Sequence, residues 1–136
     1  MKTIIVYYSF TGHCKAQAEK TAKEMGVEAY EVRDAAKLNT FKAYTWGCFQ
    51  ALRHKKGKIE PLSIHLSRYA KIIVVGPVWA GNPAPAMNAI FEEIPAGKDV
   101  EVWMVSASGN SGAENHVRAV LEGRKCQLTA YKNIKG

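Results

Sequence analysis

The chain has 136 residues, of which 47% are hydrophobic and 23% are charged. A chain of this size and composition forms one globular domain with a single core, so we expect one domain over residues 1–136. No apolar run approaches the ~18 residues of a membrane-spanning helix, and the start of the sequence lacks the pattern of a signal peptide. We therefore expect a cytoplasmic protein with no membrane partner.

Three cysteines, Cys14, Cys48 and Cys126, are too few and too scattered for a disulfide framework. No Cys/His spacing in the sequence is typical of a zinc site. We therefore expect reduced thiols and no bound metal.

The formal net charge is +7, and the excess of positive charge lies in the first half of the chain. Its densest point is residues 53–58 (RHKKGK), which could contact nucleic acid or an acidic protein. No aromatic side chains alternate with these charges, as they would on a surface that stacks bases, and a helix C-terminus by itself favours cations. A solvated helix end and loop is the favoured interpretation, and nucleic acid is not expected as a partner.

The first predicted element is a strand at Thr3–Tyr8, and a helix ended by Gly26 follows it. The helix should bury one stripe of side chains, namely Cys14, Ala18, Ala22 and Met25. A second strand is expected at Val27–Val32 and a second helix at Phe41–Leu52. The segment Leu62–Tyr69 has no pattern that predicts a helix or a strand.

The second half of the chain continues the alternation, with a strand at Lys71–Val75, a helix at Pro85–Ile94 and a strand at Val100–Val105. The last helix is expected to start at a capping box formed by Ser111 and Glu114 and to end at Gly123. The weakest strand pattern, Gln127–Tyr131, comes last.

This order predicts an α/β fold, in which helices cover both faces of a doubly wound five-stranded parallel sheet. Only residues 132–136 follow the last strand, which leaves too little chain for a last helix. Part of one sheet face would then be exposed. We expect another segment, or a second copy of the chain in a homodimer, to cover it.

Three strand-to-helix connections follow the most apolar strands, at Ser9–Cys14, Gly76–Asn82 and Ser106–Gly112. In a parallel sheet such connections meet at the carboxyl edge, where ligands bind at the point at which the strand order reverses. We refer to them as the first, second and third loops.

The first loop, SFTGHC, combines a glycine with two hydroxyl side chains at the start of a helix. Backbone N–H groups at a helix N-terminus suit a phosphate, and Ser9 and Thr11 can add donors. The spacing matches neither a Walker loop nor GxGxxG, and Lys20 stands where a cysteine phosphatase would need an arginine. The alternative is structural: Ser9 and Thr11 cap the helix and Cys14 packs in the core.

The second loop places Trp79 among small residues and prolines, and the third loop has no bulky side chain at all. An indole at a sheet edge needs a partner, which could be a flat aromatic ligand or neighbouring loops. The third loop would let its backbone approach such a ligand closely, or it could be an ordinary flexible loop.

The sequence resembles the flavodoxin family over nearly its whole length, through IIVYYSFTGHC, IIVVGPVWAGNPAPAMNAIF and VWMVSASGNSG, in this order. The resemblance implies a flavodoxin-like sheet with strand order 2-1-3-4-5 and a non-covalently bound FMN. Carried over to this chain, it implies three groups of contacts. The phosphate would lie against Ser9, Thr11, Gly12, His13 and Cys14. The isoalloxazine would lie against Pro77, Val78, Trp79, Ala80, Gly81 and Asn82. Its pyrimidine edge would meet Ala107, Ser108, Gly109 and Asn110.

His13 and Cys14 stand where the family usually has asparagine and threonine, and this chain is basic where electron carriers of the family are usually acidic. The third loop also lacks the second stacking aromatic. An open flavin face would suit hydride exchange with a nicotinamide or a quinone, unless the segment Tyr44–Phe49 covers it. We expect a redox protein that exchanges electrons with a partner protein or a small-molecule donor or acceptor. The alternative is a binding module that has lost the cofactor, which His13 and Cys14 would favour.

Overall fold

The computed structural model describes residues 2–10, 12–33 and 59–135. The strands are β1 (Thr3–Tyr8), β2 (Glu28–Val32), β3 (Lys71–Trp79), β4 (Asn82–Pro83), β5 (Asp99–Ser106) and β6 (Gln127–Lys135). The helices are α1 (His13–Met25), α4 (Pro85–Glu93), α5 (Glu114–Gly123) and the short 3₁₀ helix Leu66–Arg68. The predicted helix at Phe41–Leu52, the segment Tyr44–Phe49, the basic run 53–58 and Thr11 lie outside the described residues.

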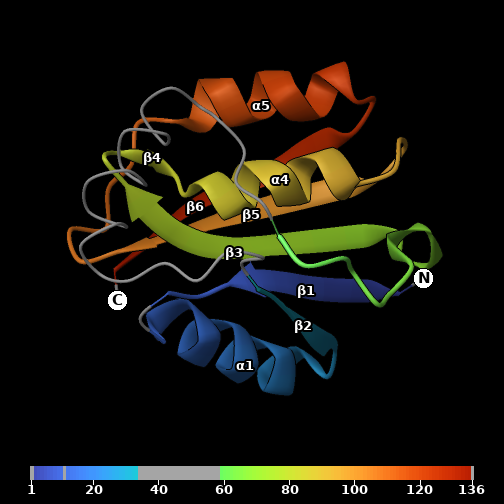
Figure 1. Cartoon of the computed structure of the whole chain (residues 1–136), viewed down its shortest axis with the longest axis horizontal. Coiled ribbons are helices and arrows are strands. Elements are labelled where there is room, and N and C mark those ends of the chain that lie inside the picture. The colour runs from blue at the N-terminus through green and yellow to red at the C-terminus, as the bar shows by residue number, and fades with distance from the viewer. Residues whose placement is uncertain (1, 11, 34–58, 136) are drawn as a thin grey trace.

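Five of the strands form a parallel sheet in the order β2-β1-β3-β5-β6, and β4 pairs antiparallel with the end of β3. Without the two-residue β4, this is the predicted order 2-1-3-4-5, so the α/β fold class is confirmed. In Figure 1 the β3 arrowhead and the C-terminus lie at the left, and the N-terminus lies at the right. The carboxyl edge of the sheet is therefore on the left in this view.

Strands β3 and β6 each continue four residues beyond the predicted ends, Val75 and Tyr131. Glycine and proline usually end a strand, so Gly76 and Pro77 led to a predicted end of β3 that is four residues too early. The pairing with β1 stops at Val75, however. Beyond it Gly76 and Pro77 pair with β5, with Pro77 opposite Val105, and the last two residues of β3 pair with β4. The missing N–H of Pro77 therefore interrupts no ladder to β1.

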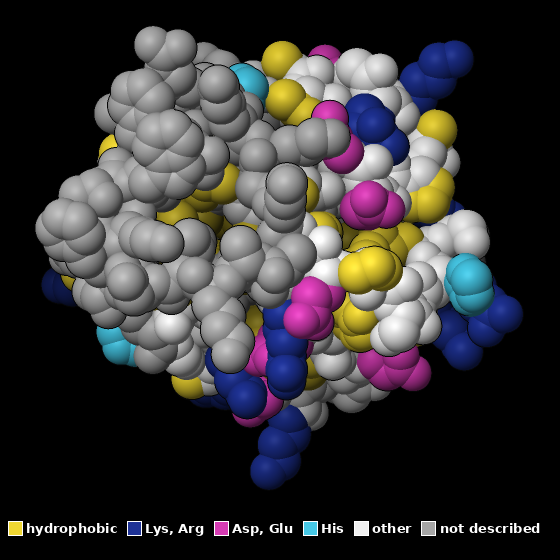
Figure 2. All heavy atoms as spheres, in the orientation of Figure 1, with side chains coloured by type: hydrophobic (Ala, Val, Ile, Leu, Met, Phe, Trp, Pro, Cys, Tyr) yellow, Lys and Arg dark blue, Asp and Glu magenta, His cyan; other side chains and the backbone are white. Residues whose placement is uncertain are grey.

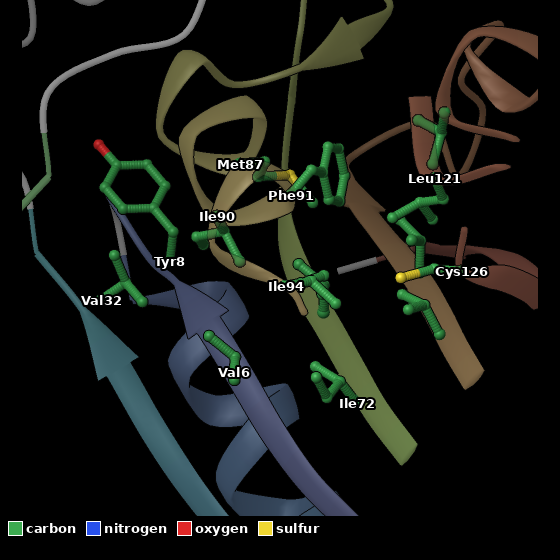
Figure 3. Packing of buried hydrophobic residues seen from close by; sticks show 14 of the residues in the cluster. Val6, Tyr8, Val32, Ile72, Met87, Ile90, Phe91, Ile94, Leu121 and Cys126 are labelled. Carbon is green, nitrogen blue, oxygen red and sulfur yellow. The ribbon is translucent and has the colours of Figure 1, made fainter. Parts of the chain in front are cut away.

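Helices α4 and α5 cover one face of the sheet, and the main hydrophobic cluster lies between them and the strands. Figure 3 shows Ile90 and Phe91 of α4, and Ile94 directly after it, reaching into this cluster, with Leu121 and strand residues around them. The periodicity predicts that Met87, Ile90, Phe91 and Ile94 face inward, and all four are buried. Of the three residues predicted to be buried on α5, Val117 and Leu121 are buried, whereas Val120 is only partly buried. The helical periodicity therefore identified this core correctly.

Helix α1 covers part of the opposite face, where it lies beside β1 and β2 at the bottom of Figure 1. Its buried stripe consists of small side chains, Cys14, Ala18, Thr21 and Ala22, which let the helix approach the strands closely. The prediction for Met25 is wrong, because this residue is 49% exposed. It lies in the last turn of α1, next to the exposed start of β2 and just before Gly26 ends the helix with φ +67°.

The part of this face formed by β5 and β6 has no described helix over it and carries a cluster of charges instead. Glu101 is 7% exposed and accepts a hydrogen bond from Trp103 Nε1 at 2.7 Å. Its carboxylate also pairs with the Nζ atoms of Lys71 at 3.1 Å and Lys132 at 3.2 Å. Lys132 Nζ lies 4.9 Å from the centre of a Trp103 ring. We call these four residues the Glu101 cluster.

Within the described ranges, Met25 is the one large hydrophobic residue that is exposed. The expected apolar patch is therefore not seen in this part of the chain, and a covering second copy stays a prediction. None of the described helices is long and apolar enough to cross a membrane. Among the same residues, no group of three or more His, Cys, Asp or Glu could hold a metal ion, and Cys14 and Cys126 are free thiols.

Candidate functional site

The first loop turns at Gly12, whose φ of +100° favours glycine, and α1 begins at the next residue. Ser9 Oγ accepts a hydrogen bond from the Gly12 N–H at 3.0 Å, so Ser9 holds the turn but does not cap α1 as the structural alternative expected, and Thr11 lies outside the described residues. Among the described residues, no side chain caps α1, and no acidic residue lies in its first turn. A Cβ at Gly12 would meet nothing within 4 Å. The turn is thus open, and the N-terminal N–H groups of α1 are suited to an anion.

The next two residues of this loop lie differently. His13 is exposed beside the open turn, whereas Cys14 is 3% exposed and packs in the α1-side cluster. Burial raises the pKa of the Cys14 thiol to about 12, so the thiol stays protonated at neutral pH. Cys14 can therefore offer an anion only its backbone N–H, and it has none of the character of a phosphatase nucleophile.

The second loop is a β-hairpin, which the sequence analysis did not predict. Val78 pairs with Pro83 and Trp79 with Asn82, so only Ala80 and Gly81 form the turn. Both have positive φ values, +52° and +78°, as a type I′ turn requires. The Asn82 side chain donates to the Ala80 carbonyl at 3.0 Å. The sequence Ala80-Gly81-Asn82 after a strand could have indicated this turn. Alanine is rare at a turn position with positive φ, however, which made the signal weak.

The hairpin holds Trp79 beside two aromatic residues of β1 and the first loop. The Trp79 ring lies 6.3 Å from Tyr8 and 5.7 Å from Phe10, with interplanar angles of 75° and 87°. Edge-to-face contacts of this kind stabilise aromatic pairs. Trp79 nevertheless remains partly exposed. Phe10 is therefore an aromatic neighbour of Trp79 that the sequence did not single out, because only the third loop and the segment Tyr44–Phe49 were considered as sources of a second aromatic residue.

The third loop is closed by hydrogen bonds among its own residues. Gly109 N–H donates to Ser106 Oγ at 3.0 Å, and Asn110 N–H donates to Ser108 Oγ at 3.3 Å. Gly109 has a φ of +73°. The loop is also tied to the hairpin, because Gly112 N–H donates to the Gly81 carbonyl at 3.1 Å. The second and third loops are thus parts of one connected structure.

The predicted capping box at Ser111 and Glu114 is wrong. Helix α5 begins at Glu114, its N-cap is Ala113, and no side chain caps it. The Ser111 hydroxyl instead lies 2.6 Å from the Tyr131 hydroxyl and 2.5 Å from Asn133 Oδ1, both on β6. Burial raises the pKa of Tyr131, so its hydroxyl stays protonated. The spacing of Ser111 and Glu114 fits a capping box, but the Ser111 hydroxyl is hydrogen-bonded to Tyr131 and Asn133 of β6 instead of to the start of α5.

A cavity of about 550 Å³ lies away from these loops, between the segment 59–67 and the end of α4. Its lining contains none of the predicted site residues and carries both Glu93 and His65. Lys98 donates to the Ser67 carbonyl at 3.0 Å, which places a cation close to the same segment. On the face shown in Figure 2, the coloured Lys and Arg side chains are scattered among acidic and neutral ones. Neither this cavity nor the distribution of positive charge on this face identifies a ligand.

No family model matches the chain, and no curated protein matches it by sequence. Solved structures do resemble it. A protein of Bacteroides eggerthii DSM 20697, inferred to be a flavoprotein, superposes with a TM-score of 0.80 at 17% identity, over 96% of this chain and 86% of that one. A flavoprotein of Lactobacillus acidophilus NCFM in complex with FMN gives 0.70 at 22%, over 96% and 91%. The flavodoxin of Streptococcus pneumonia TIGR4 gives 0.56 at 13%, over 100% and 87%.

These comparisons and the strand order establish a flavodoxin-like fold for this chain. The residues at the carboxyl edge fit a flavin mononucleotide in two respects. The uncapped first turn of α1 suits the phosphate, and the partly exposed indole of Trp79 beside the third loop suits a flat ring.

Proposed function

We propose that the protein binds FMN without a covalent bond and transfers electrons through it. The observation that carries the proposal is the arrangement of the three loops at the carboxyl edge. An open, uncapped helix start lies in the same connection as Phe10, which contacts Trp79 on the hairpin. The hairpin in turn is hydrogen-bonded to the third loop through Gly112 and Gly81. The FMN complex of a structure with the same fold supports this choice of ligand.

Each loop contributes a different kind of contact. Gly12, His13 and the backbone N–H of Cys14 would hold the phosphate, with the hydroxyls of Ser9 and Thr11 as further donors. Trp79 would stack on the ring, flanked by Pro77, Val78, Ala80, Gly81 and Asn82. The third loop has no bulky side chain at Ser108 and Gly109, which would let backbone groups approach the polar edge of the ring. Bound FMN supplies the one-electron or hydride chemistry, and no side chain need act as an acid or base.

The partner is a redox protein or a small-molecule donor or acceptor. A formal net charge of +7 favours an acidic protein or a phosphate-bearing molecule, because complementary charge accelerates encounter. Rapid reduction of bound flavin on mixing with NADPH alone would favour a reductase. Reduction only in the presence of a partner enzyme would favour an electron carrier.

Quenching of FMN fluorescence tests the proposal. We expect the wild-type protein to quench added FMN, and Trp79→Ala to weaken the affinity about tenfold through lost stacking. Trp103→Phe is the matched control, because Trp103 belongs to the Glu101 cluster on the face of the sheet opposite Trp79 and should leave the affinity unchanged. Absence of quenching by the wild type at tens of micromolar FMN would overturn the proposal.

One observation favours the alternative, a binding module without cofactor. The Trp79 ring already contacts two aromatic rings of its own chain, and these contacts bury part of the indole without a ligand. A colourless protein that does not quench FMN would support this alternative.

A further inference from the structure

Strand β6 contains one extra residue relative to β5. Val100 pairs with Leu128, but the next residue of β5, Glu101, pairs with Ala130, so Thr129 is left over as a β-bulge. The Thr129 hydroxyl donates to the Val100 carbonyl at 3.2 Å and holds the bulge in place. Because successive residues of a strand point to opposite faces, one inserted residue reverses the direction of every side chain after it.

The reversal decides what β6 presents to the third loop. After the bulge, Tyr131 pairs with Val102 and Asn133 with Met104, on the face covered by α4 and α5. Lys132 pairs with Trp103 and points to the other face, where it joins the Glu101 cluster. If Thr129 were paired with Glu101 in a regular register, each later side chain of β6 would point to the opposite face of the sheet. Lys132 would then point toward the α5 side, and the Tyr131 hydroxyl would be directed away from Ser111.

The three side chains form a directed chain of hydrogen bonds. Ser111 Oγ donates its single proton to Asn133 Oδ1 at 2.5 Å. The contact of 2.6 Å between the hydroxyls of Ser111 and Tyr131 must therefore be donated by Tyr131. The next residue along the chain, Gly112, makes the hydrogen bond to Gly81 that joins the third loop to the hairpin.

A second contact lies further along the same strand. Lys135 is the last paired residue of β6, opposite Ser106, and a Cβ added at Gly109 would lie 3.3 Å from its Cβ. We call the part of β6 after the bulge, residues 130–135, its outer half. The outer half of β6 therefore contacts the third loop at both Ser111 and Gly109. Two contacts on one rigid strand restrict the loop more than its internal hydrogen bonds would alone.

We propose that the outer half of β6, set by the bulge at Thr129, positions the third loop through the Tyr131–Ser111–Asn133 hydrogen bonds and thereby orders the ligand site. Tyr131, Ser111 and Asn133 are positioning residues, since they act through the loop. The part of this inference that concerns ligand affinity rests on the proposed binding of FMN. The ordering of the loop itself can be measured without any ligand.

Amide hydrogen exchange in the ligand-free protein provides that measurement. We expect Tyr131→Phe and Ser111→Ala to accelerate exchange of the Gly112 amide at least tenfold, because the bond to Gly81 then opens more often. Tyr69→Phe is the matched control. It also removes a tyrosine hydroxyl hydrogen bond, the one to Glu28 at 2.8 Å, but that bond lies at the start of β2, at the opposite end of the strand order from β6, so Gly112 should be unaffected.

A conservative variant separates positioning from general loss of stability. Ser111→Thr keeps a hydroxyl and should restore the protection of Gly112, whereas an effect of stability alone would affect amides throughout the sheet. In FMN titrations, Tyr131→Phe should weaken the affinity five- to tenfold and Tyr69→Phe should not. Unchanged Gly112 exchange in both Tyr131→Phe and Ser111→Ala would overturn the inference. If the wild type fails to bind FMN, the proposed function fails, and the exchange rates alone still decide whether β6 orders the loop.

Discussion

The two faces of the sheet are stabilised in different ways. The face under α4 and α5 is a continuous cluster of aliphatic and aromatic side chains, many of them fully buried, such as Phe91 and Ile90. The opposite face combines a helix with small buried side chains and, over β5, the Glu101 cluster. Hydrophobic packing dominates the first face, whereas the second combines apolar packing with a buried carboxylate that is paired with an indole and two ammonium groups.

Strand β5 participates in both arrangements because its residues alternate between the faces. Val100, Val102 and Met104 pack in the α4/α5 cluster, whereas Glu101 and Trp103 point the other way. A carboxylate on a central strand is costly unless every partner is present. Here an indole N–H and two ammonium groups meet it. Substitutions in the two faces should therefore differ in size and in their dependence on pH.

The largest effect is expected at Phe91, which is 1% exposed in the α4/α5 cluster. Phe91→Ala should reduce the free energy of unfolding by about 3–5 kcal/mol, because it removes a buried ring and leaves a cavity. Urea denaturation followed by circular dichroism measures the loss. A reduction below about 1 kcal/mol would contradict the view that hydrophobic packing dominates this face.

A smaller effect is expected at Glu101, because its lysine partners are partly in water, with side chains 39% and 55% exposed. Glu101→Gln keeps an acceptor for Trp103 but leaves both ammonium groups without a counter-charge, and should cost about 1–2 kcal/mol in urea denaturation. The control is Glu114→Gln, which breaks the exposed pair with Arg118 and should change stability by less than about 0.5 kcal/mol. Equal effects of the two variants would show that the Glu101 cluster is no more than a surface ion pair.

The Glu101 cluster should also make stability depend on pH. Burial acts to raise the pKa of Glu101, but hydrogen bonds from Trp103, Lys71 and Lys132 outweigh it and hold the pKa below its usual 4.5. The stabilising contribution is therefore complete above about pH 4.5 and is lost as the pH falls through the lower folded-state pKa. We expect the wild type to lose stability relative to Glu101→Gln below pH 4.5. Parallel pH profiles of the two proteins in urea denaturation would contradict this.

Most of the fold could be predicted from the sequence because apolar periodicity determines which residues are buried. The three most apolar strands and the core of α4 and α5 followed directly from it. Periodicity does not reveal an inserted residue such as Thr129, because the bulge depends on pairing with β5. It also did not identify the environment of Glu101, whose partners come from three different strands.

The candidate site was predictable in its location but less so in its geometry. Topology alone brings the three loops to one edge, so their proximity could be inferred without coordinates. The contact of Phe10 with Trp79 and the bond of Ser111 to β6 depend on tertiary contacts. The hairpin at Ala80 and Gly81 is local, but its alanine is rare at a position with positive φ. Local propensity gave Ser111 a capping role because it could not account for Tyr131 and Asn133.

The smallest effect is expected at Lys132, whose side chain is 55% exposed and lies over the Trp103 ring. Lys132→Met keeps an apolar stem over the indole but removes the ammonium group, so it should cost only about 0.5–1 kcal/mol. NMR of the Trp103 indole N–H provides a local readout, because the bond to Glu101 should persist with a changed chemical shift. Lys15→Met is the control: it removes an exposed lysine 3.9 Å from Glu31 and should leave that signal in place. A cost above that of Glu101→Gln would mean that the cation over the indole, rather than the buried carboxylate, holds this face together.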